Sequence, residues 1–147
     1  MRFRHVTVVH VPLDLAYGWW TSFSEEDGSE EGPLLSRRIP FRMERGLLIE
    51  DEYAYLNRRF TLKGRVKIRP PDSYWVEYYG EIVQVRLKYM FASVVEGTQL
   101  VVLGDVRGKG WLKAFLPLFW PRIKREMIAG IDSNVRMVEG LSQAHDS

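Results

Sequence analysis

Six consecutive segments between residues 36 and 107 alternate apolar and polar side chains with a period of two. That period places alternate side chains on opposite faces of a β-strand. Only short turn signals separate the segments, at Gly46, Asn57, residues 70–72, Gly80 and Gly97. Connections this short join antiparallel neighbours, so the sequence predicts a meander of six strands. The predicted strands are 36–45, 47–56, 59–69, 73–79, 82–95 and 98–107.

One further strand and two helices flank the predicted meander. Residues 2–11 predict a strand that ends at Pro12, and residues 13–23 carry an apolar stripe with helical spacing. The acidic, glycine-rich segment 24–33 has no periodicity, so we expect a loop with at most a short helix. Near the C-terminus, apolar residues recur at the spacing of one face of a long helix. They are Ile123, Met127, Ile131, Val135, Val138 and Leu141.

The length of 147 residues fits one domain, which we place at residues 1–142 with a frayed tail at 143–147. The chain has no cysteine, which excludes disulfides and thiol nucleophiles. The N-terminal apolar run is too short for a signal peptide, and residues 111–120 are too short and too interrupted to span a membrane. We therefore expect a cytoplasmic protein. Few Asn and Gln beside abundant Glu, Lys and Arg are typical of a thermophile.

The outward side chains of the predicted strands alternate in charge from one strand to the next. Opposite charges on neighbouring strands stabilise a sheet by about 0.2–1 kcal/mol per pair. We therefore interpret the basic strand 59–69 as one rung of a charge ladder and expect no nucleic-acid partner. The alternative is a nucleic-acid-binding surface, which predicts salt-dependent oligonucleotide retention that fails when Arg65 and Lys67 are neutralised.

Large aromatic side chains are frequent at the inward positions. A buried tyrosine hydroxyl needs a hydrogen-bond partner, so a cluster of inward tyrosines favours a pocket that holds water or a ligand with polar groups. The alternative is an ordinary core in which some tyrosines reach solvent at strand ends. The inward aromatics are Phe41, Tyr53, Tyr55, Phe60, Tyr78, Tyr89 and Phe91 from the sheet, and Trp111, Phe115 and Phe119 from the helical region.

The whole order, a strand, a helical excursion, six antiparallel strands and a long amphipathic helix, resembles the helix-grip superfamily of START lipid-transfer domains, pollen-allergen-like proteins and polyketide cyclases. The resemblance lies in "VTVVHVPLDLAYGWWTSF", "VVEGTQLVVLGDV" and "WLKAFLPLFWPRIKREMIAGIDSNVRMVEG" and covers almost the whole chain. It implies an α+β fold in which a curved seven-stranded antiparallel sheet wraps around the C-terminal helix. It also implies an apolar cavity for a lipid, polyketide, sterol, quinone or similar molecule. Two departures are the acidic segment 24–33, where relatives often carry a second short helix, and Pro117 and Pro121 at the start of the terminal helix.

We therefore predict a hydrophobic small-molecule ligand that the protein transfers or sequesters in this cavity. The alternative is a polyketide cyclase- or hydratase-type enzyme that acts in the same cavity. The predicted lining consists of Phe41, Tyr53, Tyr55, Phe60, Tyr78, Tyr89, Phe91, Phe115, Phe119, Ile123, Met127 and Ile131.

Signals for catalysis are few. Asp51 shares the inward register of Ile49 and Tyr53, where a carboxylate is a candidate general base toward an enolisable ligand. The alternatives for Asp51 are a strand-end position or an ion pair with an arginine. His5 and His10 fall on opposite faces of the first strand, so no metal site is predicted. No phosphate-binding or cofactor motif is present, and we expect no cofactor.

The stretch "WLKAFLPLFW", residues 111–120, has more apolar residues than one helix face can bury. It closes the cavity, docks a partner subunit or makes a transient contact with a membrane surface. Lys113, Arg122, Lys124 and Arg125 nearby would suit an anionic bilayer.

Overall fold

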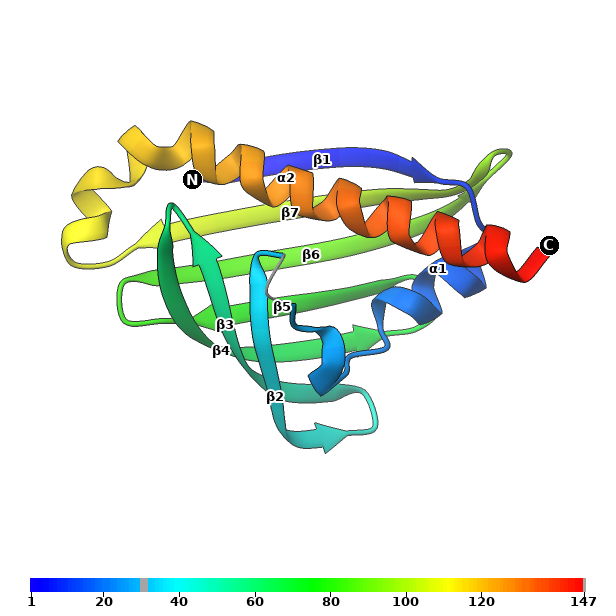
Figure 1. Cartoon of the computed structure of the whole chain (residues 1–147), viewed down its shortest axis with the longest axis horizontal. Helices are drawn as coiled ribbons and strands as arrows, with labels where there is room; N and C mark the ends of the chain where they lie inside the picture. Colours follow the sequence, from blue (N-terminus) through cyan, green and yellow to red (C-terminus); the bar gives the residue numbers. More distant parts are fainter. Residues whose placement is uncertain (30–31, 147) are drawn as a thin grey trace.

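In the part of the chain that the structure describes, residues 1–29 and 32–146 of a computed structural model, seven antiparallel strands form one sheet in the order β1-β7-β6-β5-β4-β3-β2. This sheet with a long C-terminal helix and a short helix after the first strand confirms the predicted α+β helix-grip architecture (Figure 1). The elements are β1 (Arg2–Val9), α1 (Leu13–Trp20), η1 (Glu25–Asp27), β2 (Leu34–Met43), β3 (Gly46–Tyr55), β4 (Arg58–Arg69), β5 (Ser73–Tyr79), β6 (Val83–Val94), β7 (Gly97–Gly108) and α2 (Trp111–Asp146).

The outward charges of the sheet alternate as the sequence predicts. Arg65 of β4 lies opposite Glu77 of β5, which lies opposite Arg86 of β6. At the other side of the sheet, the Arg38 guanidinium is 3.0 Å from the Glu50 carboxylate. The basic residues of β4 therefore belong to a charge ladder on the outer face.

The sheet is strongly curved (Figure 1). In Figure 1, β1, β7 and β6 run alongside α2, whereas β2 and β3 cross the view steeply. Register shifts between Leu34 and Ser36 and between Arg38 and Phe41 mark irregular pairing of β2 with β3. Such irregularities bend a strand and increase its twist. The bend carries β2 and β3 away from the plane of the other strands and leaves room under α2.

Helix α2 is continuous through both of its prolines. Pro117 and Pro121 cannot donate to the preceding turn, and proline inside a helix kinks it. Figure 1 shows the first turns of α2 bent relative to the rest. At its other end α2 continues to Asp146, past residue 142, where the sequence predicted a frayed tail; residue 147 lies outside the described residues. No helix in the described chain has the length and apolar character that crossing a membrane requires.

A tightly packed core occupies the end of the molecule where α2 covers β1 and β7. Val9, Leu100 and Val102 are fully buried there, and Val135 and Val138 of α2 are also buried. Two histidines tie the region of β1 to the helix. His5 Nε2 is 2.8 Å from Asp132 Oδ1, and His10 Nδ1 is 2.6 Å from Glu139 Oε2. This packing fixes α2 at one end, while the curved part of the sheet faces its other half.

Candidate functional site

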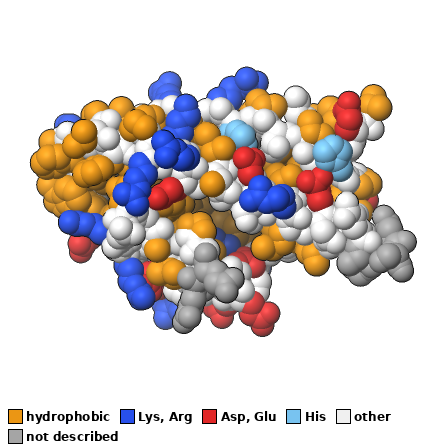
Figure 2. Space-filling view, turned by 45° about the horizontal axis from the view of Figure 1, so that its top comes forward, with side chains coloured by type: hydrophobic (Ala, Val, Ile, Leu, Met, Phe, Trp, Pro, Cys, Tyr) orange, Lys and Arg blue, Asp and Glu red, His pale blue; other side chains and the backbone are white. Residues whose placement is uncertain are grey.

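A cavity of about 850 Å³ lies between the curved sheet and α2. Small-molecule sites in proteins usually occupy about 300–1,000 Å³. Strands β3 to β6 contribute one wall, and Ile123, Met127 and Ile131 of α2 contribute the opposite one. Residues 26–29 around η1, with Pro33 and Leu34, line the remaining side. Figure 2 shows a hollow in this face of the molecule with hydrophobic side chains in its depth.

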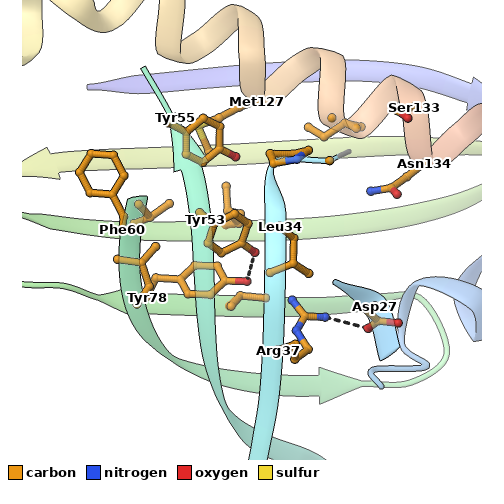
Figure 3. A pocket seen from close by; sticks show the side chains of 18 of the residues that line it. Asp27, Leu34, Arg37, Tyr53, Tyr55, Phe60, Tyr78, Met127, Ser133 and Asn134 are labelled. Carbon is orange, nitrogen blue, oxygen red and sulfur yellow. Dashed lines mark hydrogen bonds and ion pairs between the residues drawn. The ribbon is translucent and has the colours of Figure 1, made fainter. Parts of the chain in front are cut away.

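The lining is mainly apolar, with scattered polar residues at Ser22, Glu26, Ser29, Ser133 and Asn134, and one hydrogen-bonded polar cluster lies at the sheet side. The Arg37 guanidinium in β2 donates two bonds to the Asp51 carboxylate in β3, with Nε–Oδ1 at 2.9 Å and Nη2–Oδ2 at 2.8 Å. Its third nitrogen, Nη1, donates to Asp27 Oδ2 of η1 at 2.9 Å. The hydroxyls of Tyr53 and Tyr78 are 3.2 and 3.1 Å from Asp51 Oδ2 and 2.8 Å from each other. In Figure 3 these hydroxyls point toward one another, and Arg37 extends toward Asp27.

The tyrosines and the arginine of the cluster keep fixed protonation states at neutral pH. Burial raises the pKa of Tyr53 and Tyr78 well above the usual 10. The negative charge of Asp51 raises both pKa values further, and Tyr78 also raises the pKa of Tyr53. Both hydroxyls therefore stay protonated. Burial alone would lower the pKa of the Arg37 guanidinium, but the hydrogen bonds to Asp51 and the electrostatic interactions with Tyr78, Tyr53 and Asp51 together outweigh this effect, and the pKa is raised. Arg37 is thus a permanent cation. It is paired with two carboxylates, those of Asp27 and Asp51.

The acidic segment around η1 is held against β2 by several bonds. Ser24 and Asp27 form a capping box that closes the turn. Glu25 Oε1 accepts a hydrogen bond from the Ile39 amide at 2.9 Å. The Arg37 guanidinium lies 5.2 Å above the Phe23 ring, in the geometry of a cation–π contact. The predicted loop therefore contains a short helix whose carboxylate completes the polar cluster at the cavity wall.

Stacked tyrosines provide flat surfaces elsewhere in the cavity wall. Tyr74 and Tyr89 are stacked, with ring centroids 4.5 Å apart and planes 5° from parallel. Tyr53 and Tyr55 are stacked at 5.8 Å. Burial raises the pKa of Tyr89 to about 12, so its hydroxyl is also protonated at neutral pH. Flat apolar faces beside protonated hydroxyls suit a ligand with a planar ring system and few polar atoms.

Eight of the twelve residues predicted to bind a ligand line this cavity. The sheet residues share inward positions on β3 to β6, and the helix residues share one face of α2, as their spacing implies. Whether they contact a ligand stays a prediction. The eight are Tyr53, Tyr55, Phe60, Tyr78, Tyr89, Ile123, Met127 and Ile131.

The other four predicted residues are not part of the cavity lining. Phe41 follows the register shift in β2 and is 53% exposed, so its expected inward orientation is wrong. Phe91 points inward but packs in the core against Tyr17, with ring centroids 5.5 Å apart. Phe115 is 48% exposed because Leu112 and Leu116 take the inward positions of that helical turn. Phe119 packs against the core.

Asp51 is only 1% exposed and forms the ion pair with an arginine that the sequence left as an alternative to a general base. It stands behind Tyr53 and Tyr78 rather than in the lining itself. Arg37 and Asp27 are residues of the cluster that the sequence patterns did not identify. Arg37 lies two residues before the inward residue Ile39, so period-two alternation places both side chains on the inward face. That pattern could have identified Arg37. Asp27 joins the site through tertiary packing, for which the sequence carries no periodic signal.

Neither a protein-family model nor a curated protein matches this sequence. Several solved structures share its fold. TTHA0849 from Thermus thermophilus has a TM-score of 0.79 at 12% identity, with all of both chains covered. The Zhui aromatase/cyclase from Streptomyces sp. R1128 has a TM-score of 0.79 at 13% identity, covering 95% of this chain and 93% of that one.

Ara h 8.0201 has a TM-score of 0.66 at 14% identity, covering 93% of this chain and 98% of that one. Identities this low relate the chains by fold alone. The chain has the helix-grip fold that the aromatase/cyclase and Ara h 8.0201 share.

Proposed function

We propose that this protein binds a hydrophobic small molecule, for transfer or sequestration, in the cavity between the sheet and α2. The observation that carries the proposal is a cavity of about 850 Å³ whose mainly apolar lining contains a hydrogen-bonded polar cluster around Arg37. An apolar pocket with a few fixed polar groups is the usual composition of a small-molecule site. The apolar lining supplies affinity, and the cluster orients the ligand.

The charge of the cluster indicates which polar group the ligand presents. Arg37 carries one positive charge, and Asp51 and Asp27 carry two negative charges. A carboxylate ligand would add a third negative charge in a buried setting, which is costly without a further cation. A neutral hydroxyl or carbonyl can share hydrogen bonds with the hydroxyls of Tyr53 and Tyr78 instead. We therefore expect a neutral ligand with a polar atom at this end.

Two ligands with the same ring system test this expectation. We expect 2-naphthol to bind at least about tenfold more tightly than 2-naphthoate in isothermal titration, which corresponds to about 1.4 kcal/mol. Native mass spectrometry of the freshly purified protein, compared with a denatured sample, would weigh any ligand that copurifies. A bare chain that also binds neither naphthalene derivative would contradict the proposal.

Adjacent tyrosines provide a matched pair of variants for the same measurement. Tyr78→Phe removes a hydroxyl from the cluster, whereas Tyr79→Phe removes one from the outer face, where it donates to Glu77. The proposal predicts weaker 2-naphthol binding for Tyr78→Phe and unchanged binding for Tyr79→Phe. Equal effects of the two variants would show that the hydroxyls of the cluster do not contact the ligand.

A polyketide cyclase-type enzyme is the second candidate. The Asp51–Tyr53–Tyr78 hydrogen bonds favour it, because Tyr53 can turn its proton from Asp51 to a ligand carbonyl while Tyr78 continues to donate to Asp51. Asp51→Asn would disturb the pair with Arg37 and is therefore a poor test of catalysis. Tyr53→Phe is a sharper one: an enzyme would lose turnover of a poly-β-ketone while retaining binding, and a binding protein would show no turnover in the unsubstituted chain.

A further inference from the structure

The first turns of α2 expose three large apolar side chains on one face. Trp111 is 46% exposed, Phe115 is 48% exposed and Leu118 is 73% exposed. Their spacing of four and three residues places them together along the helix. We call these three residues the α2 patch. Figure 2 shows hydrophobic side chains gathered at one end of the molecule, with Lys and Arg side chains beside them.

The segment that carries the α2 patch is basic throughout. Residues 106–125 contain six Lys and Arg and no Asp or Glu, in a chain whose net charge is only +2. Arg107 pairs with Asp105 and Arg122 with Glu126. The other four cations form no ion pair with any residue that the structure describes, and all four are exposed: Lys109, Lys113, Lys124 and Arg125.

The opposite face of the same turns belongs to the cavity. Leu112 and Leu116 are buried and line it. The tip of the β3–β4 hairpin lies against the start of the helix, because the Arg58 guanidinium is 5.4 Å from the centre of the Trp111 ring. Leu56 in this tip also lines the cavity. The α2 patch is therefore the outer surface of one end of the cavity wall.

We propose that the α2 patch docks on the surface of an anionic lipid bilayer. Tryptophan, phenylalanine and leucine on one helix face are the side chains that enter the interface, and neighbouring cations add attraction to anionic headgroups. A second copy of the chain fits less well, because a two-fold interface would bring the same four unpaired cations toward each other. A protein partner also fits less well, because the centres of protein interfaces are depleted in lysine.

Docking at this end would bring one wall of the cavity to the surface of a bilayer, into which hydrophobic molecules partition. The inference goes beyond the proposed ligand binding and does not depend on it, since vesicle binding needs no ligand in the cavity.

Co-sedimentation with vesicles tests the docking. We expect the protein to sediment at low salt with vesicles that contain phosphatidylserine in phosphatidylcholine, and far less with phosphatidylcholine alone or at high salt. Leu118→Ser should reduce the bound fraction, whereas Leu141→Ser, the same change at an exposed leucine near the other end of α2, should not.

A second pair of variants tests the charges, with the same change in net charge in both. Lys113→Ser with Lys124→Ser should weaken partitioning to phosphatidylserine vesicles by about tenfold or more. Lys63→Ser with Lys67→Ser removes the same charge from the outer face of the sheet and should leave partitioning unchanged. Circular dichroism of all variants checks that the fold is intact.

Three outcomes would overturn the docking: no sedimentation with phosphatidylserine vesicles at low salt, equal sedimentation of Leu118→Ser and the unsubstituted protein, or a dimer in light scattering that Leu118→Ser dissolves. The last result would assign the patch to a second copy of the chain. Binding of 2-naphthol by the same variants is read separately and should not change, so failure of docking and failure of ligand binding are distinguishable.

Discussion

Arg37 and Asp51 occupy directly opposite positions on β2 and β3, and both nitrogens on one edge of the guanidinium contact the carboxylate, at 2.9 and 2.8 Å. The next pair along the same two strands, Arg38 and Glu50, is also an ion pair but faces solvent. These two arginine–carboxylate ion pairs, at successive positions along the same strands, thus differ mainly in burial.

This difference predicts unequal effects on stability. Arg37→Leu leaves the buried Asp51 carboxylate without its cation, and breaking a buried pair costs about 3–5 kcal/mol of unfolding free energy. Glu50→Gln breaks the exposed pair and should cost at most about 1 kcal/mol. Urea unfolding measures both. Similar losses for the two variants would contradict the assigned role of the buried pair.

The double variant Arg37→Leu with Asp51→Leu supplies the control for the buried pair. Replacing both charges by apolar side chains removes the cost of an unpaired buried charge, so it should be more stable than Arg37→Leu alone. If the double variant were the less stable of the two, the loss in Arg37→Leu would stem from packing rather than from the charge.

The raised pKa values of the buried tyrosines predict that the unfolding free energy decreases at alkaline pH. Burial raises the pKa of Tyr53, Tyr74 and Tyr78 well above 10, which is close to their value in the unfolded chain. Their contribution is therefore complete below about pH 10 and falls as the pH rises further, because only the unfolded chain releases these protons. Each unit of pKa difference is worth about 1.4 kcal/mol per tyrosine.

Two measurements check the alkaline prediction. The unfolding free energy from urea titrations should be level toward pH 9 and decline from about pH 10 upward. Ultraviolet absorbance of the native protein should show tyrosine ionisation delayed relative to the unfolded chain. Tyr78→Phe should make the decline shallower; superimposable native and unfolded titration curves would refute the assigned burial.

Much of the fold could be predicted because period-two patterning and turn residues are local signals. The strand at 73–79 agrees residue for residue, and the others agree within a few residues. The register shift before Phe41 could not be predicted in this way, since a bulge changes the facing side without changing the residue types. Periodicity beyond the shift therefore assigned Phe41 to the wrong face.

Period-two alternation also identified the inward face of the sheet, but it did not show where the cavity ends on that face. Tyr89 and Phe91 are both inward on β6, yet only Tyr89 lines the cavity, because the residues from α1 fill the space beside Phe91. That limit depends on where α1 packs, which no local pattern encodes. Arg37 is the opposite case. Alternation along its strand places Arg37 on the inward face, and it lies opposite Asp51, so the buried ion pair could have been predicted.

The cavity itself predicts where a larger side chain is tolerated. Val85 lines the cavity, whereas Val102 is fully buried in the packed core. Val102→Phe should cost about 1–3 kcal/mol of unfolding free energy because the core has no room for a ring. Val85→Phe can place its ring in the open space, so its loss should stay below about 1 kcal/mol while 2-naphthol binding weakens. Urea unfolding and isothermal titration of both variants measure the contrast; equal destabilisation would mean that the space beside Val85 cannot hold a ring and would remove it from the ligand site.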